Sequence, residues 1–164
     1  MTISTRTYQN IMVSGDGVPV EGKVYAALYP GHLVEWYNDS TVEKLRKHAT
    51  EGGTGAPFIV AIEDEEQGKT IDDVYAVDNN MKARALQGGE EVYLRLKDGE
   101  SVVYGDKVES AGDGTVQKHT AVLGDSSAPV TIYFNSIVGT VRQIIDRTDS
   151  SGGDTSAFVL VQAA

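Results

Sequence analysis

The chain has 164 residues, a length that suits one domain. Its 14 basic and 24 acidic residues give a formal charge of −10, which would repel a nucleic-acid backbone or an anionic membrane. No stretch approaches the roughly eighteen apolar residues of a membrane span. Because the chain contains no cysteine, a disulfide framework, a thiolate zinc site and a cysteine nucleophile are excluded.

The first twenty residues are polar and contain no apolar stretch able to form a core. They lack the apolar centre of a signal peptide, so we expect a soluble, unprocessed chain. We also expect residues 1–20 to lie outside a single β-domain of residues 21–164. Two interpretations remain open, a partly disordered terminus or an extended arm that adds a strand to a neighbouring subunit's sheet. In the second, Tyr8, Ile11 and Val13 are the candidate apolar contacts.

The segment STVEKLRKHA, residues 40–49, fits two secondary structures equally well. Ser40, followed three residues later by Glu43, forms a capping box for a short helix, whereas the alternative is a strand with Leu45 facing inward. Either element carries the densest basic cluster of the chain, which consists of Lys44, Arg46 and Lys47 beside His48. This cluster either binds acidic groups of a partner or only offsets nearby acids such as Glu43 and Glu51.

Strand patterns occupy most of the remaining chain. EVYLRLK alternates as a half-buried strand does, with Tyr93 and Arg95 facing outward. PFIVAIE and AFVLV are continuous apolar runs, typical of strands that are covered on both faces, and VTIYF and residues 137–145 are further strands. Turn signals separate these runs, and glycine, at 18 residues, is enriched. The pattern predicts a mainly β fold, a compact barrel or sandwich with at most one or two short helices.

The segment GDKVESAGDGTVQ, residues 105–117, has three glycines and two Gly-Asp pairs but almost no reactive side chains. Gly-Asp before Lys107 lets the chain reverse sharply, and Asp113-Gly114 is a strong tight-turn pair before a strand near Thr115. The segment is therefore interpreted as a structural turn that sets strand register.

Residue types that support catalysis are present but not in an arrangement that indicates an enzyme. His32, His48 and His119 share no metal-binding spacing, and Gly-x-Ser-x-Gly is absent. The acidic run EDEEQGKTIDD, residues 63–73, matches no calcium loop and is interpreted as a solvated hairpin tip between strands at Phe58–Ile62 and Val74–Val77. No glycine-rich stretch has the form of a phosphate loop. We expect no catalytic residue, no metal site and no cofactor.

Three blocks of the sequence, in this order and spacing, resemble the head decoration proteins, or cement proteins, of tailed bacteriophages. The blocks are YPGHLVEW at 29–36, APFIVAIEDEEQGKTIDDVYAV at 56–77 and SVVYGDKVESAGDGTVQK at 101–118. The resemblance covers residues 20–120 and implies a β-tulip domain that binds the major capsid protein as a homotrimer on the outer surface of the virion. The C-terminal third departs from the family pattern through an additional strand pair.

The resemblance makes a structural virion protein the leading hypothesis, made in the host cytoplasm and without direct contacts to nucleic acid or membrane. Trp36, Tyr37, Tyr75 and Tyr104 are possible aromatic anchors, although core positions explain each equally well. The candidate capsid or subunit contacts are Tyr8, Ile11, Val13, Trp36, Tyr37, Lys44, Arg46 and Lys47. The alternatives are a small-ligand binding module of the β-clip or barrel-sandwich kind, which requires a convergent polar pocket, and a hydrolase that uses the carboxylates of residues 63–73.

Overall fold

The computed structural model describes residues 10–55, 57–120, 135–148 and 157–164, and within them the strands form three antiparallel sheets, none closed into a barrel. One sheet has six strands in the order β1 (Met12–Ser14), β7 (Glu91–Arg95), β13 (Phe158–Ala163), β11 (Ile137–Val141), β9 (Lys107–Ser110) and β10 (Val116–Lys118). A second has five, in the order β2 (Val18–Lys23), β6 (Asn80–Ala85), β5 (Ile59–Ala61), β3 (Leu33–Asp39) and β4 (Val42–Lys47). The third pairs β8 (Ser101–Val102) with β12 (Ile145–Asp146), and a 3-10 turn, η1, spans Glu65–Gln67. The predicted mainly β fold class is confirmed.

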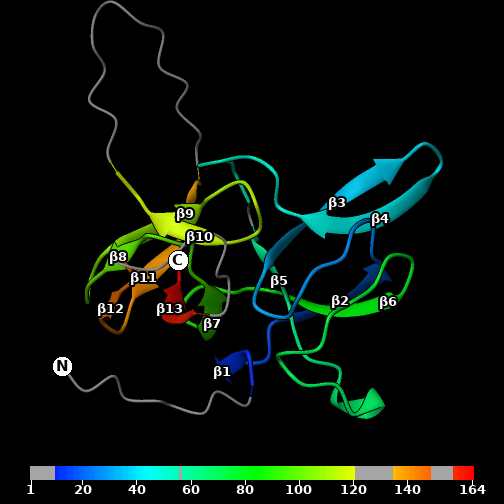
Figure 1. The fold of residues 1–164 in the computed structure, drawn as a ribbon, viewed down its shortest axis with the longest axis horizontal. Coiled ribbons are helices and arrows are strands. Elements are labelled where there is room, and N and C mark those ends of the chain that lie inside the picture. Colours follow the sequence, from blue (N-terminus) through cyan, green and yellow to red (C-terminus); the bar gives the residue numbers. More distant parts are fainter. Residues whose placement is uncertain (1–9, 56, 121–134, 149–156) are drawn as a thin grey trace, which may run out of the picture.

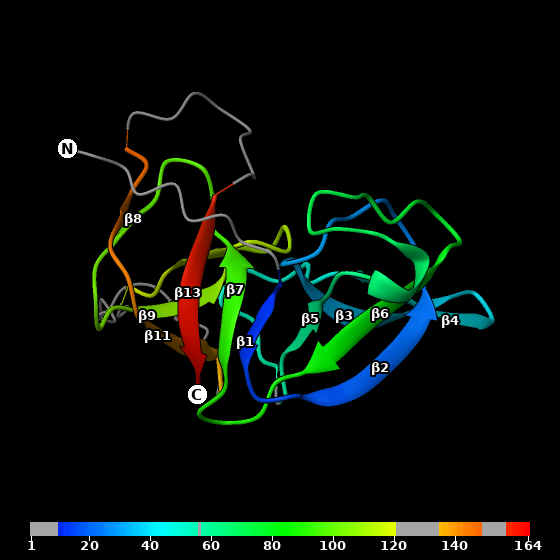
Figure 2. The same cartoon turned by 90° about the horizontal axis from the view of Figure 1, so that it is seen from below.

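The sheets form two lobes that lie side by side (Figures 1 and 2). Lobe A contains β1 and β7–β13, and lobe B contains β2–β6 and η1. Each lobe has its own core, with 19 buried hydrophobic residues in the cluster of lobe A and 8 in that of lobe B. Strand β1 is the edge of the six-stranded sheet and lies on the side that faces lobe B (Figure 2).

Strands β3 and β5 belong to lobe B but contribute to both cores. Successive side chains of a strand point to opposite faces, so Leu33 and Val60 join the core of lobe A while Val34 and Ala61 join the core of lobe B. This explains why PFIVAIE is an uninterrupted apolar run, since no face of β5 is left to solvent. The predicted burial of this strand on both faces is confirmed.

The N-terminal segment is built into the chain's own sheets, at least from residue 10 onward. Strand β1 pairs with β7, β2 pairs with β6 across all six of its residues, and Ile11 is fully buried in the core of lobe A. The predicted boundary after residue 20 therefore falls inside β2, and the prediction of a separate arm is wrong for residues 10–20. Tyr8 lies outside the described residues.

Residues 42–47 form a strand rather than a helix. Strand β4 pairs with β3 in a continuous register from Asp39↔Val42 to Val34↔Lys47, and Leu45 enters the core of lobe B. Ser40 has a φ of 64°, so it occupies the left-handed position of a tight hairpin turn and not the extended conformation of a helix N-cap. Of the two interpretations left open by the sequence, the strand is confirmed.

Other strand predictions require correction. Tyr93 and Arg95 were expected to face outward from β7, but both are buried. Arg95 lies under loops of lobe B, where the Pro30 and Ile71 carbonyls accept its hydrogen bonds. Residues 137–145 form two strands, β11 and β12, instead of one. Val74–Val77 is not a strand, since its one ladder contact is an isolated bridge between Tyr75 and Leu28. The predicted strand VTIYF lies outside the described residues.

The glycine-rich segment 105–117 is a hairpin, as predicted, and its turn joins the two lobes. The turn links β9 to β10 and packs against lobe B, where Leu33 N–H donates to the Gly114 carbonyl (2.7 Å) and Gly114 N–H donates to the His48 carbonyl (3.2 Å). Gly112 has a φ of 83°, and a Cβ there would lie 2.9 Å from the Glu51 backbone nitrogen. Glycine is required because the turn adopts the left-handed conformation directly against the backbone of lobe B.

Candidate functional site

The predicted contact residues do not form one surface. Ile11 is buried and cannot contact a partner, so its prediction as a contact is wrong, whereas Val13 is exposed on the edge strand β1. Trp36 lies on β3 with 47% of its surface exposed, and its ring is close to Gly22, where a Cβ would come within 3.0 Å. Tyr37 is half-buried beside Tyr25, with ring centroids 4.6 Å apart. The β3–β4 hairpin of lobe B thus carries one exposed aromatic side chain, Trp36, with the half-buried Tyr37 on the same strand.

Two members of the basic cluster of β4, Lys44 and Arg46, are paired within lobe B. Lys44 Nζ lies 3.0 Å from Asp39 and 2.9 Å from Asp78, and hydrogen bonds to these carboxylates raise its pKa. Arg46 binds Glu35 at 2.7 Å, with its guanidinium 4.2 Å from the centre of the Tyr37 ring. The offsetting acids are therefore the cross-strand partners Glu35 and Asp39 and the loop residue Asp78, rather than the predicted Glu43 and Glu51.

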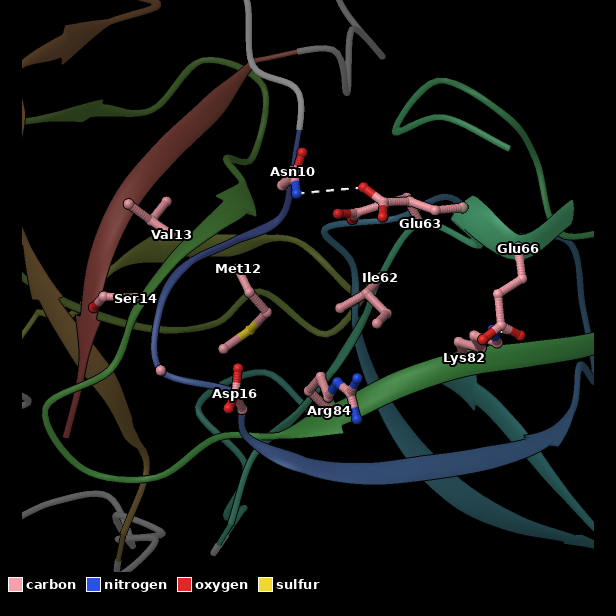
Figure 3. A pocket seen from close by; sticks show the side chains of 12 residues that line it. Asn10, Met12, Val13, Ser14, Asp16, Ile62, Glu63, Glu66, Lys82 and Arg84 are labelled. Atoms are coloured by element: carbon pink, nitrogen blue, oxygen red, sulfur yellow. Dashed lines mark hydrogen bonds and ion pairs between the residues drawn. The ribbon is translucent and has the colours of Figure 1, made fainter. Parts of the chain in front are cut away.

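A groove of about 600 Å³ runs between the lobes (Figure 3). One wall is the edge strand β1 with the turn that follows it, and the other is the outer face of β6 with residues 62–66. The side chains of Met12, Asp16 and Arg84 point into the same space (Figure 3). With the described residues the Arg84 guanidinium forms no hydrogen bond or ion pair, whereas Lys82 is held by Asp64 (3.1 Å) and Glu66 (2.6 Å). Arg84 was not predicted as a site residue, although the alternation of NMKARA places it on the face opposite Met81 and Ala83.

The acidic segment after β5 is only partly a solvated tip. Glu63 and Asp64 are buried, and Glu63 Oε2 accepts the Ile11 backbone N–H at 3.1 Å, which ties β1 to lobe B. The prediction of a solvated hairpin tip is wrong for these two residues, because the chain turns inward before η1. Among the described residues, no group of three or more His, Asp or Glu side chains is placed to bind a metal ion.

Glu35, His48 and Ser110 are arranged in a row across the junction of the lobes. The Ser110 hydroxyl lies 2.9 Å from His48 Nδ1, and Glu35 Oε2 lies 3.8 Å from His48 Nε2. Ser110 is fully buried, and its hydroxyl also accepts the Gly112 N–H at 3.2 Å. A substrate cannot reach this hydroxyl, so the row connects sheets and does not provide an accessible nucleophile.

A buried arginine and a buried histidine complete the junction. Arg95 donates to the carbonyls of Pro30 (2.7 Å) and Ile71 (3.0 Å), and its guanidinium lies 4.6 Å from the centre of the Phe158 ring. Burial, together with the positive charges of Lys47 and Arg95, lowers the pKa of His32 to about 3. His32 is therefore neutral in the folded protein near neutral pH, and its Nδ1 accepts the Tyr29 N–H.

Comparison with known proteins gives a likeness of fold to a solved structure. No protein-family model matches the chain, and no curated protein matches it in sequence. Among solved structures, it is similar to the N base of head fiber gp8.5 of bacteriophage phi29, with a TM-score of 0.53 and 10% identity over 90% of this chain and 93% of that one. At such identity the likeness establishes a shared fold. No helix in the described part of the chain has the length and apolar character to cross a membrane.

Proposed function

We propose that the chain is a structural protein of a bacteriophage head, which decorates and stabilises the icosahedral shell from its outer surface. The observation that carries the proposal is the likeness of fold to the gp8.5 N base, which extends over nearly the whole of both chains. The resemblance of three sequence blocks to decoration proteins supports the same role from a separate line of reasoning.

The proposed partners are the major capsid protein and further copies of this chain in a homotrimer, without a cofactor. A trimer that binds three shell subunits makes its second and third contacts intramolecular, so weak individual contacts suffice. The proposal assigns no enzymatic activity to the chain. The buried position of Ser110 supports this, because the His48-linked hydroxyl is closed to substrate.

We place the contact with the shell at the β3–β4 hairpin, around Trp36. An exposed tryptophan that rests on a glycine is a rigid aromatic anchor, the kind of side chain that dominates protein interfaces. The charges of Lys44 and Arg46 are already paired with carboxylates of lobe B, so attachment depends more on Trp36 than on the basic cluster.

The test is binding of the purified chain to phage heads that lack it, in expanded and unexpanded form, with the bound copies per head measured after sedimentation. We expect saturable binding to at least one form, and a lower occupancy for Trp36→Ala. The control is Val18→Ala, which shortens a similarly exposed side chain on β2. Absence of wild-type binding to both forms would contradict the proposed function, and equal occupancy of the two variants would remove Trp36 from the contact.

The inter-lobe groove favours a second candidate, a small-ligand binding module. Its Arg84 guanidinium, to which none of the described residues binds, forms with apolar Met12 and Ile62 a mixed polar and apolar lining of the kind that ligand sites use. The test is a thermal-shift screen of small carboxylates against the wild type and Arg84→Ala. A stabilising ligand whose effect disappears in Arg84→Ala, without any binding to heads, would favour this candidate over the structural role.

A further inference from the structure

The two most exposed large hydrophobic side chains of the described residues, Ile144 and Tyr104, belong to lobe A, as does the exposed Val103. Ile144 is 65% exposed, Tyr104 62% and Val103 47%. These residues are at the end of lobe A that is farthest from the β3–β4 hairpin, beside the pair β8–β12 (Figures 1 and 2). None of them belongs to the groove or to the proposed shell contact.

Strand register explains why these side chains share one face. Ile145 pairs with Val102 at the end of an antiparallel ladder, and Ile144 and Val103 are the residues directly beyond this pair on the two chains. Val102 is buried and Ile145 packs on the core of lobe A, and alternation therefore turns Ile144 and Val103 to the outside. We call this surface, with Tyr104 and Arg142, the Ile144 patch.

Tyr104 is held in place at the border of the patch. Arg142 donates a hydrogen bond of 2.6 Å to the Tyr104 hydroxyl, and its guanidinium lies 5.3 Å from the centre of the ring. The Gly105 N–H donates to the Val141 carbonyl at 2.9 Å, which fixes the adjoining backbone. A tyrosine and an arginine with restricted side chains beside two branched apolar residues have the composition of an interface centre.

The charges around the patch indicate which partner covers it. Two copies of a chain with a charge of −10 repel each other, so a contact between them is least opposed where local charge is balanced. Three ion pairs of the described residues adjoin the patch: Arg142–Glu91 (3.9 Å), Lys118–Asp106 (2.9 Å) and Arg147–Asp98 (3.6 Å). Asp106 also accepts the Val103 backbone N–H at 2.9 Å, so each of these three cations has a carboxylate partner beside the apolar side chains.

We propose that the Ile144 patch is the surface by which copies of this chain bind one another. Near a three-fold axis, the same patch of each copy meets its equivalents, so a nearly neutral apolar surface is self-complementary. The proposal deepens the proposed function, because it assigns trimer formation to lobe A and leaves the β3–β4 hairpin of lobe B for the shell.

The test is sedimentation velocity over a concentration series for the wild type, Ile144→Glu and Val77→Glu. Val77 is the matched control, since it is 52% exposed on lobe B and receives the same change. We expect Ile144→Glu to raise the dissociation constant for self-association by about tenfold or more, and Val77→Glu to leave it unchanged. Ile144→Ser, which adds no charge, should also weaken association.

Two results would overturn the assignment. One is a wild type that stays monomeric up to about 1 mM, and the other is equal self-association of Ile144→Glu and the control. Binding to heads is measured separately on the same preparations, so the two proposals fail independently. If trimers form through Ile144 but never bind heads, only the proposed head function is refuted. If the chain binds heads but assembles equally well with Ile144→Glu, only the assignment of the patch is refuted.

Discussion

Lobe A and lobe B differ in the size of the hydrophobic core that stabilises each of them. Lobe A encloses 19 buried hydrophobic residues between its sheet and the elements that cover it, whereas the cluster of lobe B has 8. Lobe B also supplies Leu33 and Val60 to the larger core, and its loops hold Arg95 through two carbonyls. The comparison indicates that lobe B is stabilised largely by its contacts with lobe A, and that the two lobes unfold together.

The largest expected effect is from Leu33→Ala. The residue lies on a strand of lobe B but is fully buried in the core of lobe A, so its truncation should lower the free energy of unfolding by about 2–5 kcal/mol. Urea denaturation measures the loss, and amide hydrogen exchange should show reduced protection in both β4 and β7. The matched variant is Leu45→Ala, which empties a fully buried position in the core of lobe B itself. If Leu45→Ala produced a separate early transition, the lobes would be independent units.

Alanine substitutions at two glycines distinguish the cost of backbone strain from the cost of disturbing the contact between the lobes. Gly105 and Gly112 both have positive φ, but a Cβ at Gly105 meets nothing within 4 Å, whereas one at Gly112 meets the backbone of Glu51. Alanine at either position introduces backbone strain of about 1–2 kcal/mol. Because its Cβ would also press on the Glu51 backbone, we expect Gly112→Ala to be about 1–3 kcal/mol more destabilising than Gly105→Ala. Urea denaturation of the two variants gives the difference. Equal losses would mean that the turn does not press on lobe B.

The smallest effect is a pH dependence from the junction. Because the pKa of His32 is about 3 when folded and 6.5 when unfolded, the unfolded chain alone takes up this proton as the pH falls below 6.5. Stability should therefore decrease by about 1.4 kcal/mol per pH unit, or about 2 kcal/mol between pH 6.5 and pH 5. Urea titrations at several pH values should give a smaller slope for His32→Gln than for the wild type. Identical slopes would show that His32 takes up its proton in the folded protein over the same pH range as in the unfolded chain.

Much of the fold was predictable from the sequence because its signals are local. The hairpin at 105–117 follows from Gly-Asp turn chemistry, and the burial of β5 on both faces follows from an uninterrupted apolar run. Arg95 shows the limit of this reasoning. Its alternation in EVYLRLK indicates an outward side chain, but a loop 65 residues away in sequence covers that face. Such tertiary burial of a polar residue leaves no periodic signal.

The candidate sites were less predictable than the fold. The sequence identifies Lys44 and Arg46 as a basic cluster, but only the register of β3 against β4 reveals Glu35 and Asp39 as their partners. Ile11 was interpreted as part of an arm because its neighbours are polar, and its burial depends on pairing with β7, some 80 residues later. The groove is formed by elements from both lobes, and Arg84 becomes notable only once these are placed together.

The position of Trp36 allows the intrinsic fluorescence of the protein to report on which surface is covered. It is the single tryptophan of the sequence, and it lies on the hairpin of lobe B, far from the Ile144 patch. Indole emission shifts to shorter wavelength when water around the ring is displaced, because the excited dipole is then solvated less strongly. Attachment to a shell through the hairpin would therefore be visible as a blue shift without any label, while assembly through lobe A would leave the spectrum unchanged.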